Sequence, residues 1–356
     1  MIAGILKQFL IEGPGITIED LGNGLINKTW LVKNGAKKYV LQKINLHVFK
    51  DPHLIDNNIQ LIANYLQLHH PEYLFTTPIV AVNNKTLIAA DDETYYRLFN
   101  FIEDSHVFQV VESETLAYEA SKQFGKFSRL LSAFDISGLS ITLPHFHDLS
   151  LRYKQFKDAI SNATTERLSI AHPYINDLEN YKHIVAAYEN IVRDDNYKLR
   201  VMHHDTKISN VLFTADKKGL CVIDLDTVMP GYFISDTGDM MRTYLSPVDE
   251  EETDLSKIKI REAYFEAVVK GYLSEMQYEL TKAEINSFIY AGKFMMYMQA
   301  LRFITDYLNN DIYYGAKYPL HNLNRAINQL TLLNNFVAKE SLLQKIVKAC
   351  LLQKNE

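Results

Sequence analysis

The sequence contains little of several features that define whole classes of protein. Only two cysteines occur among its 356 residues, so neither a disulfide framework nor a cysteine-based zinc cluster is encoded. Fourteen glycines and nine prolines are few for this length, which argues against an all-β protein with many tight turns. No uncharged apolar run approaches the roughly 18 residues that cross a bilayer, so we expect no membrane association.

The balance of charge excludes another class of protein. Lysine and arginine total 37 against 43 aspartates and glutamates, which gives a formal net charge of −6. A chain with this sign is poorly suited to binding nucleic acid through its phosphates. The N-terminal stretch also lacks the basic start and the small-residue cleavage site of a secretory signal. We therefore expect a cytoplasmic protein that does not bind nucleic acid.

The first hundred residues alternate between strand patterns and one helical pattern. Runs rich in β-branched and aromatic residues are separated by turn signals. A helical spacing of apolar residues follows the Asp51-Pro52 start signal. The expected order is strand, strand, strand, helix, strand, strand, in the ranges 15–34 (two strands), 37–45, 51–70, 75–91 and 94–102.

From about residue 104 the apolar period becomes helical. A strand pair is expected over 211–226, and long helices are expected over 150–162, 173–194, 257–275, 282–309 and 321–350. The chain is therefore predicted to be α+β, with a small β-rich lobe over 1–103 and a larger, mostly helical lobe over 104–356. Residues 98–104 would connect the two lobes, and a cleft between lobes is the expected ligand site.

One loop contains the residues that point to chemistry. The stretch "HHDTKISNVLF" places Asp205, Lys207 and Asn210 immediately before a strand. After one turn the chain returns as "CVIDLDTV", which brings Asp224 beside Asn210 at the end of the paired strands. An aspartate that receives a hydroxyl proton, together with an asparagine and a second aspartate that hold Mg²⁺, is typical of phosphoryl transfer, which depends on alignment and charge neutralisation.

These motifs resemble the aminoglycoside phosphotransferase and choline kinase group over nearly the whole chain. Within that group, "LGNGLINKTWLV", "YVLQKIN", "HHDTKISNVLF", "CVIDLDTVMPG" and "LRFITDYLNNDIYY" are similar to bacterial N-acetylhexosamine 1-kinases. The resemblance implies a protein-kinase-like bilobal fold, an antiparallel N-terminal sheet with one main helix, and the use of ATP and Mg²⁺. The implied acceptor is the anomeric hydroxyl of N-acetylglucosamine or N-acetylgalactosamine.

The catalytic loop residues then receive roles. Asp205 would orient the acceptor hydroxyl and take its proton, whereas the alternative is a loop aspartate that only caps backbone amides. Lys207 could contact the migrating phosphate or be a solvated loop lysine. Asn210 and Asp224 would bind Mg²⁺ through oxygen atoms. Asp226 should point the same way as Asp224 and could reach the metal, the sugar or a loop backbone; we group it with the substrate residues.

The nucleotide is expected to contact the first lobe. Gly22 and Gly24 could expose backbone amides to phosphate, and Asn27 and Thr29 resemble the continuation of this turn in the family. The connector backbone over 100–102, which comprises Asn100, Phe101 and Ile102, would bond the adenine edge.

Lys43, on a strand, would reach the α and β phosphates. Here the sequence departs from the wider pattern, since no glutamate lies between Lys43 and Glu72. The following helix offers only Asp51 and Asp56 as acidic partners. Either a shorter aspartate substitutes or the lysine is held in another way.

The acceptor is expected to contact the last third of the chain. Arg302 interrupts an otherwise apolar helical pattern, and a charge so placed usually faces a cleft or a partner. Asp306, one turn later, could join it in sugar binding or form an ordinary intrahelical ion pair, and Tyr314 follows. Asp239 is expected to brace the catalytic loop, with Arg242 as a possible anion partner.

Three functions remain open from the sequence. The leading hypothesis is an ATP-dependent N-acetylhexosamine 1-kinase. A second enzyme hypothesis keeps the chemistry but uses another alcohol, such as a different sugar, choline, homoserine or an aminoglycoside. The third is a catalytically silent kinase-like binding protein, which the missing glutamate supports and the intact set of Lys43, Asp205, Asn210 and Asp224 opposes.

Overall fold

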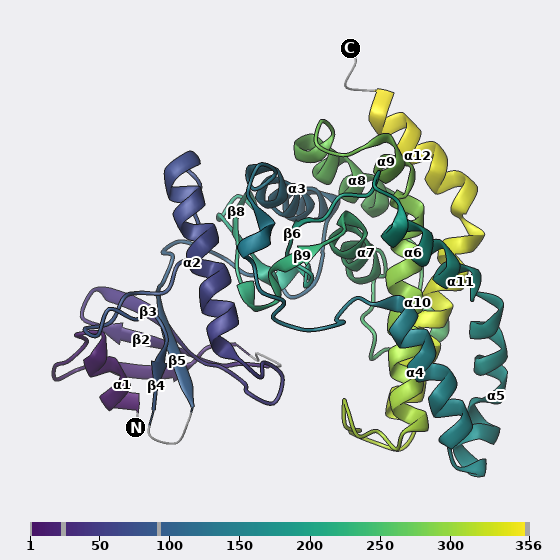
Figure 1. Ribbon diagram of the computed structural model, residues 1–356, viewed down its shortest axis with the longest axis horizontal. Helices are drawn as coiled ribbons and strands as arrows, with labels where there is room; N and C mark the ends of the chain where they lie inside the picture. Colours follow the sequence, from purple (N-terminus) through teal and green to yellow (C-terminus); the bar gives the residue numbers. More distant parts are fainter. Residues whose placement is uncertain (1, 23–25, 91–93, 353–356) are drawn as a thin grey trace.

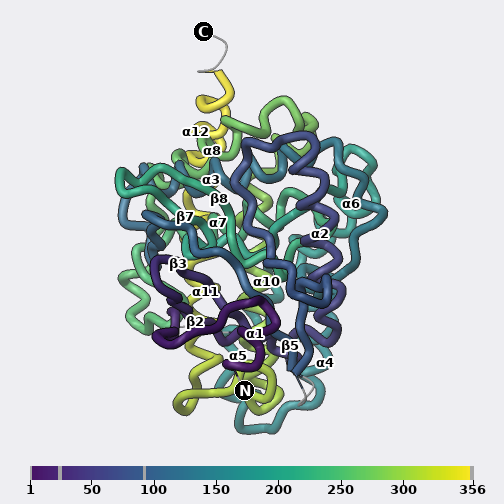
Figure 2. The backbone as a smooth tube through the Cα atoms, turned by 90° about the vertical axis from the view of Figure 1, so that its left-hand side faces the viewer, coloured from purple at the N-terminus to yellow at the C-terminus, as the bar shows by residue number. Residues whose placement is uncertain are grey.

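The computed structural model describes residues 2–22, 26–90 and 94–352 of the chain. A small lobe that contains a β-sheet lies beside a larger, mostly helical lobe (Figure 1). Figure 2 shows the molecule from the side of the small lobe. In the described part of the chain, no helix has both the length and the apolar character needed to cross a membrane.

The small lobe is built on an antiparallel sheet with the strand order β1-β2-β3-β5-β4. One face carries Trp30, Val32, Leu41 and Leu98, which pack on a short N-terminal helix that the sequence patterns did not predict. The other face carries alternate residues and forms one wall of the cleft. The elements are α1 (Ile2–Gln8), β1 (Thr17–Asp20), β2 (Lys28–Asn34), β3 (Lys37–Lys43), β4 (Ile88–Ala89) and β5 (Tyr95–Asn100).

The main helix of the small lobe, α2 (Pro52–His69), begins where the sequence predicts. The Asp51 side chain accepts a hydrogen bond from the His53 amide at 3.0 Å, and a proline at the first helical position needs no amide partner. The apolar face of α2 does not pack into the core of the sheet but joins the core of the large lobe. Asn58 Nδ2 extends this attachment by donating to the carbonyls of Ser140 at 2.8 Å and Val228 at 3.0 Å.

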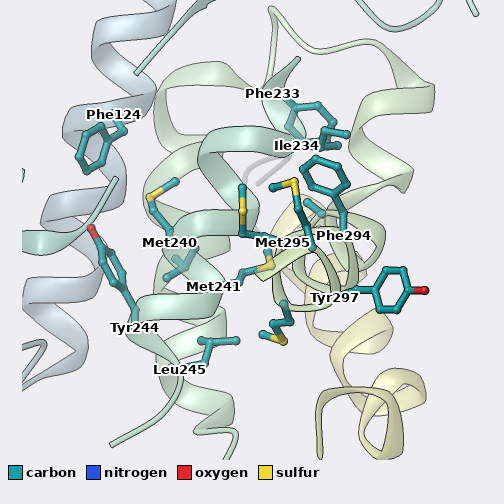
Figure 3. Packing of buried hydrophobic residues seen from close by; sticks show 14 of the residues in the cluster. Phe124, Phe233, Ile234, Met240, Met241, Tyr244, Leu245, Phe294, Met295 and Tyr297 are labelled. Carbon is teal, nitrogen blue, oxygen red and sulfur yellow. The ribbon is translucent and has the colours of Figure 1, made fainter. Parts of the chain in front are cut away.

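The large lobe is organised around one long buried helix, α10, which packs on α4, α7 and α11. Figure 3 shows methionines of α7 and α10, including Met240, Met241 and Met295, at this contact. A Cβ at Gly238 would lie 2.4 Å from the Ala291 carbonyl oxygen, so glycine permits the close approach of the two helices. The helices are α3 (Glu114–Leu130), α4 (Leu149–Asn162), α5 (Thr165–Asn180), α6 (His183–Arg193), α7 (Phe233–Tyr244), α8 (Glu262–Met276), α9 (Lys282–Asn286), α10 (Phe288–Leu308), α11 (His321–Ala338) and α12 (Glu340–Leu352).

Three predicted helices are each divided in two. The helix expected over 173–194 begins earlier, because Thr164 caps α5 by accepting from the Arg167 amide, and it is interrupted between α5 and α6. The ranges 282–309 and 321–350 break into α9 with α10 and α11 with α12. Apolar periodicity marks which residues are buried, but it does not reveal the one or two residues at which the chain turns between two helices.

The strand pair predicted over 211–226 is present as two short antiparallel strands, β7 (Val211–Phe213) and β8 (Gly219–Val222). A second pair was not predicted and joins β6 (Arg200–Met202) to β9 (Met229–Gly231). The predicted catalytic loop lies between β6 and β7 and is therefore flanked by the two pairs.

Candidate functional site

A cleft of ≈ 2690 Å³ separates the two lobes. A pocket for one small molecule usually encloses about 300–1,000 Å³, so this cleft has room for a nucleotide and an acceptor together. The predicted catalytic loop, the cleft face of the sheet and the C-terminal part of α10 all line it.

Carboxylates of α7 hold the predicted catalytic loop in place. The Asp236 carboxylate accepts the backbone amides of His203 at 3.0 Å and His204 at 2.8 Å. One helical turn later, Asp239 Oδ2 accepts the Thr206 amide at 2.8 Å. Asp239 therefore braces the loop as expected. Asp236 was missed by the sequence reasoning, although its spacing of three residues from Asp239 was a usable signal.

Asp205 lies at the cleft with two partners on one oxygen. Its Oδ2 accepts Lys207 Nζ at 2.8 Å and Asn210 Nδ2 at 3.0 Å. Burial alone would raise the pKa of Asp205, but the ammonium of Lys207 and these hydrogen bonds outweigh burial and hold the pKa below its usual range. The carboxylate is therefore ionised at neutral pH. Its Oδ1 has no hydrogen-bond donor among the described residues and can meet an acceptor hydroxyl.

Asn210 and Asp224 lie side by side at the ends of β7 and β8, because the Ile223 amide donates to the Asn210 carbonyl at 2.9 Å. Asn210 Nδ2 also donates to the Asp205 carbonyl at 2.8 Å, which orients the side-chain amide and leaves its Oδ1 as an acceptor. Burial, followed by the nearby charges of Asp226 and Asp205, raises the pKa of Asp224 to about 7. A divalent cation would relieve this repulsion, and the oxygen donors fit Mg²⁺.

Asp226 lines the cleft with Asp224, as expected, but residues of the small lobe hold its carboxylate. Its Oδ2 accepts Asn27 Nδ2 at 2.6 Å, and its Oδ1 is paired with the Arg97 guanidinium. Both oxygens are thus used by the small lobe, and the side chain is buried. These contacts and the burial of the side chain favour a role for Asp226 in joining the lobes over a contact with the sugar.

Asn27, expected to contact the nucleotide, also has two protein partners, since its Oδ1 accepts the Asn45 amide at 3.0 Å. Thr29 faces the cleft and accepts Gln42 Nε2 at 3.4 Å. Gly22 lines the cleft with a left-handed φ of +70°, a conformation that glycine adopts without strain. Gly24 lies outside the described residues.

Lys43 does not face the cleft. On β3 the cleft is lined by Val40 and Gln42, and strand alternation sends Lys43 to the opposite face with Leu41. There its Nζ lies 5.9 Å from the centre of the Tyr96 ring. The expectation that Lys43 reaches the phosphates is therefore wrong, because the cleft-facing residue at this point of β3 is its neighbour Gln42.

The connector residues Asn100, Phe101 and Ile102 line the cleft at the end of β5. The Phe101 amide donates to the Lys38 carbonyl at 3.1 Å, so the β3–β5 pairing already occupies that amide. This leaves the backbone on either side of Phe101 for an adenine edge.

Arg302 lies on α10 and lines the cleft. Its guanidinium carbon is 5.5 Å from the centres of both the Phe146 and Tyr314 rings, and Nη1 donates to Gln299 Oε1 at 3.2 Å. All four residues line the cleft. An arginine held between two aromatic rings is positioned without a carboxylate partner among the described residues.

Asp306 is a structural residue rather than a sugar ligand. Its carboxylate accepts the backbone amides of Tyr313 at 2.7 Å and Tyr314 at 2.9 Å, and Asn322 Nδ2 at 3.0 Å. The side chain is buried and orders the loop that follows α10. These partners favour a role for Asp306 in binding the loop over the expected contact with the sugar. No ion pair joins Asp306 to Arg302 among the described residues, so the alternative is not observed either.

Two histidines, the half-buried His147 and the buried His204, lie near Arg302 in the cleft with their Nδ1 atoms 3.3 Å apart. Desolvation, followed by the neighbouring His203, lowers the pKa of His204 to about 4. Desolvation, followed by His204 and nearby arginines, holds the pKa of His147 well below its usual range. Both rings are therefore neutral at pH 7. This part of the cleft offers neutral donors and acceptors beside a cationic arginine.

Comparisons with known proteins bear on the family and the fold of this chain. A family model described as the phosphotransferase enzyme family matches residues 17–274. A microcompartment-associated aminopropanol kinase superposes with a TM-score of 0.66 at 13% identity, covering 96% of this chain and 98% of that chain. A spectinomycin phosphotransferase in complex with ADP and spectinomycin gives 0.57 at 14% identity, with coverages of 98% and 97%. A choline kinase from Cryptosporidium parvum gives 0.53 at 15% identity, with coverages of 95% and 96%.

Identities this low establish the fold alone, and they confirm the predicted α+β architecture with an antiparallel N-terminal sheet and a helical C-terminal part. The family itself rests on the sequence match, which spans well over half of the chain. The protein therefore belongs to the phosphotransferase enzyme family.

Proposed function

We propose that the protein is an ATP-dependent kinase that phosphorylates the anomeric hydroxyl of an N-acetylhexosamine. The observation that carries the transfer step is the arrangement of Asp205, whose Oδ2 is held by Lys207 and Asn210 while Oδ1 stays open to the cleft. Membership of a phosphotransferase family supports the reaction type. The choice of acceptor rests on the resemblance of the sequence motifs and on the chemistry around Arg302.

In the proposed reaction, Asp205 orients the anomeric hydroxyl and takes its proton as the oxygen attacks the γ-phosphorus. The bond from that phosphorus to the bridging oxygen breaks, and ADP leaves with the electron pair. Lys207 lies close enough to Asp205 to place its ammonium near the migrating phosphoryl group. Asn210 and Asp224 would hold Mg²⁺, which neutralises phosphate charge when bound.

The acceptor end of the cleft supports a neutral, polar acceptor over a polycation. Three of its carboxylates already have cationic or histidine partners: Asp239 and Glu250 pair with Arg242, and Glu251 pairs with His321. Arg302 can donate to an acetamido carbonyl or to sugar hydroxyls, and Phe146 offers an apolar ring face. An aminoglycoside would instead need unpaired acidic groups, and choline would need an aromatic cage without a guanidinium in it.

An acceptor panel tests this proposal. The purified protein is incubated with Mg²⁺, ATP or GTP, and either N-acetylglucosamine, N-acetylgalactosamine, glucose, ethanolamine, choline, aminopropanol or an aminoglycoside. We expect turnover with an N-acetylhexosamine, and phosphorus and proton NMR should place the phosphate on the anomeric oxygen. Turnover only with an amino alcohol would overturn the acceptor and keep the kinase. No turnover by a folded protein that still binds nucleotide would favour a silent binding protein.

A further inference from the structure

The cleft face of the sheet carries one buried cation, Arg97 of β5. Its side chain lies on the same face as Phe99, over whose ring the guanidinium carbon sits at 5.3 Å. Nε and Nη2 both donate to Gln42 Oε1, at 3.0 and 2.9 Å, and Nη2 also pairs with Asp226. The residue as a whole is only 2% exposed.

The third nitrogen of this guanidinium, Nη1, is buried without a hydrogen-bond partner in the described ranges. A buried donor that lacks an acceptor costs free energy, so such groups in native proteins usually have a functional explanation. Here the guanidinium lines a cleft that also contains Asp205, Asn210 and Asp224. A ligand with negatively charged oxygens would give Nη1 its missing acceptor.

The register of β3 explains why an arginine is needed at this point. Kinase-like clefts use a lysine on this strand to contact the α and β phosphates, but here the cleft-facing position of β3 is Gln42 and the neighbouring Lys43 lies on the opposite face. β3 and β5 are adjacent strands, and Gln42 is paired with Arg97 in the sheet. Arg97 therefore projects from the next strand to the place that a β3 lysine would fill.

We propose that Arg97 is the phosphate-contacting cation of this protein and that Gln42 and Asp226 are its positioning residues. The inference rests on the proposed use of a nucleotide. It also accounts for the missing glutamate on α2, because the acidic partner of the cation is Asp226 of the large lobe. The Arg97–Asp226 pair joins the two lobes beside Asp224, so the cation is in place only when the lobes are correctly aligned.

The test compares nucleotides that differ in phosphate number, measured by calorimetry without any acceptor. The variants are Arg97→Gln, Arg97→Lys and the matched control Lys43→Gln. We expect Arg97→Gln to lower the affinity for Mg²⁺-bound ADP and for a non-hydrolysable ATP analogue by about 10- to 100-fold, which is the scale of a charge-assisted hydrogen bond. Adenosine affinity should change less than about threefold, and Arg97→Lys should lie between the wild type and Arg97→Gln.

A different pattern of affinities is expected if the Arg97–Asp226 pair only stabilises the contact between the lobes. In that case Arg97→Gln lowers the melting temperature while the ratio of ADP to adenosine affinity stays at the wild-type value, and that result would overturn the proposal. A loss of ADP affinity in Lys43→Gln would overturn it as well, because the strand lysine would then be the phosphate contact. If Arg97→Gln does not fold, the ratio of ADP to adenosine affinity is measured in Arg97→Lys. A fall in this ratio supports the proposal, and the wild-type value overturns it. Failure of the wild type to bind any nucleotide would remove the proposed function itself.

Discussion

The two walls of the cleft are built by different rules. The wall from the large lobe takes Asp205, Lys207 and Asn210 from one short loop, so their spacing in the sequence survives directly in space. The wall from the sheet takes its residues from separate strands, and each residue reaches the cleft only if its strand has the right register. A shift of one residue turns a strand side chain to the other face. The arrangement of site residues can therefore be predicted from sequence when one loop supplies them, but not when single residues come from separate strands.

The largest expected effect falls on the loop-built wall. Asp205→Asn should lower kcat by about 10²- to 10⁴-fold, the usual contribution of a positioned general base, while the affinity for Mg²⁺-bound nucleotide stays within about threefold. Steady-state kinetics and calorimetry on the same preparation check this. Asp195→Asn, a substitution at an exposed position, is the matched control and should behave as the wild type. Unchanged turnover in Asp205→Asn would remove the role given to this carboxylate.

The second largest effect is expected at the proposed Mg²⁺ site. Asp224→Asn should lower kcat by about 10²- to 10³-fold, the scale of losing one charged stabilising group, and should raise the Mg²⁺ concentration needed for half-maximal rate. Asn keeps the shape of the side chain, so the melting temperature should not fall; removing a carboxylate that is crowded by Asp226 and Asp205 should even raise it slightly. A normal Mg²⁺ dependence in this variant would contradict the assignment of the metal site.

The third effect lies at the acceptor end. Arg302→Met should raise KM for the acceptor by about 10- to 100-fold, because a charged donor to the substrate is lost, while methionine preserves much of the apolar contact with Phe146 and Tyr314. Nucleotide affinity should remain at the wild-type value. Arg193→Met removes an exposed arginine and serves as the control. A change in nucleotide affinity with an unchanged acceptor KM would contradict this assignment, because Arg302 would then contact the nucleotide and not the acceptor.

The smallest effect on turnover is expected for Asp306. Asp306→Asn replaces one acceptor oxygen that binds the loop after α10, so the free energy of unfolding should fall by about 1–3 kcal/mol. Chemical denaturation measures this, and acceptor KM should rise less than in Arg302→Met. A large rise in KM without loss of stability would restore Asp306 as a direct sugar ligand.

The sequence was sufficient for the architecture because apolar periodicity changes from strand-like to helical near residue 104. It was also sufficient to bring Asp205, Asn210 and Asp224 together, since a loop and a strand pair join them. It failed for Asp306 because carboxylates that bind backbone amides look the same in sequence as carboxylates that bind ligands. It failed for Arg97 because no short motif links a residue of β5 to its partners, Gln42 of β3 and Asp226 of the large lobe.

The attachment of α2 to the large lobe determines where the molecule can be divided. A cut at the proposed lobe boundary, residue 103, would take away Ile55, Ile59 and Ile62, which fill the core of the larger part. The remaining fragment would expose an apolar trough along its surface and would be prone to aggregate. An independently expressed catalytic half would therefore have to keep α2, for example by co-expression of a peptide over residues 51–70.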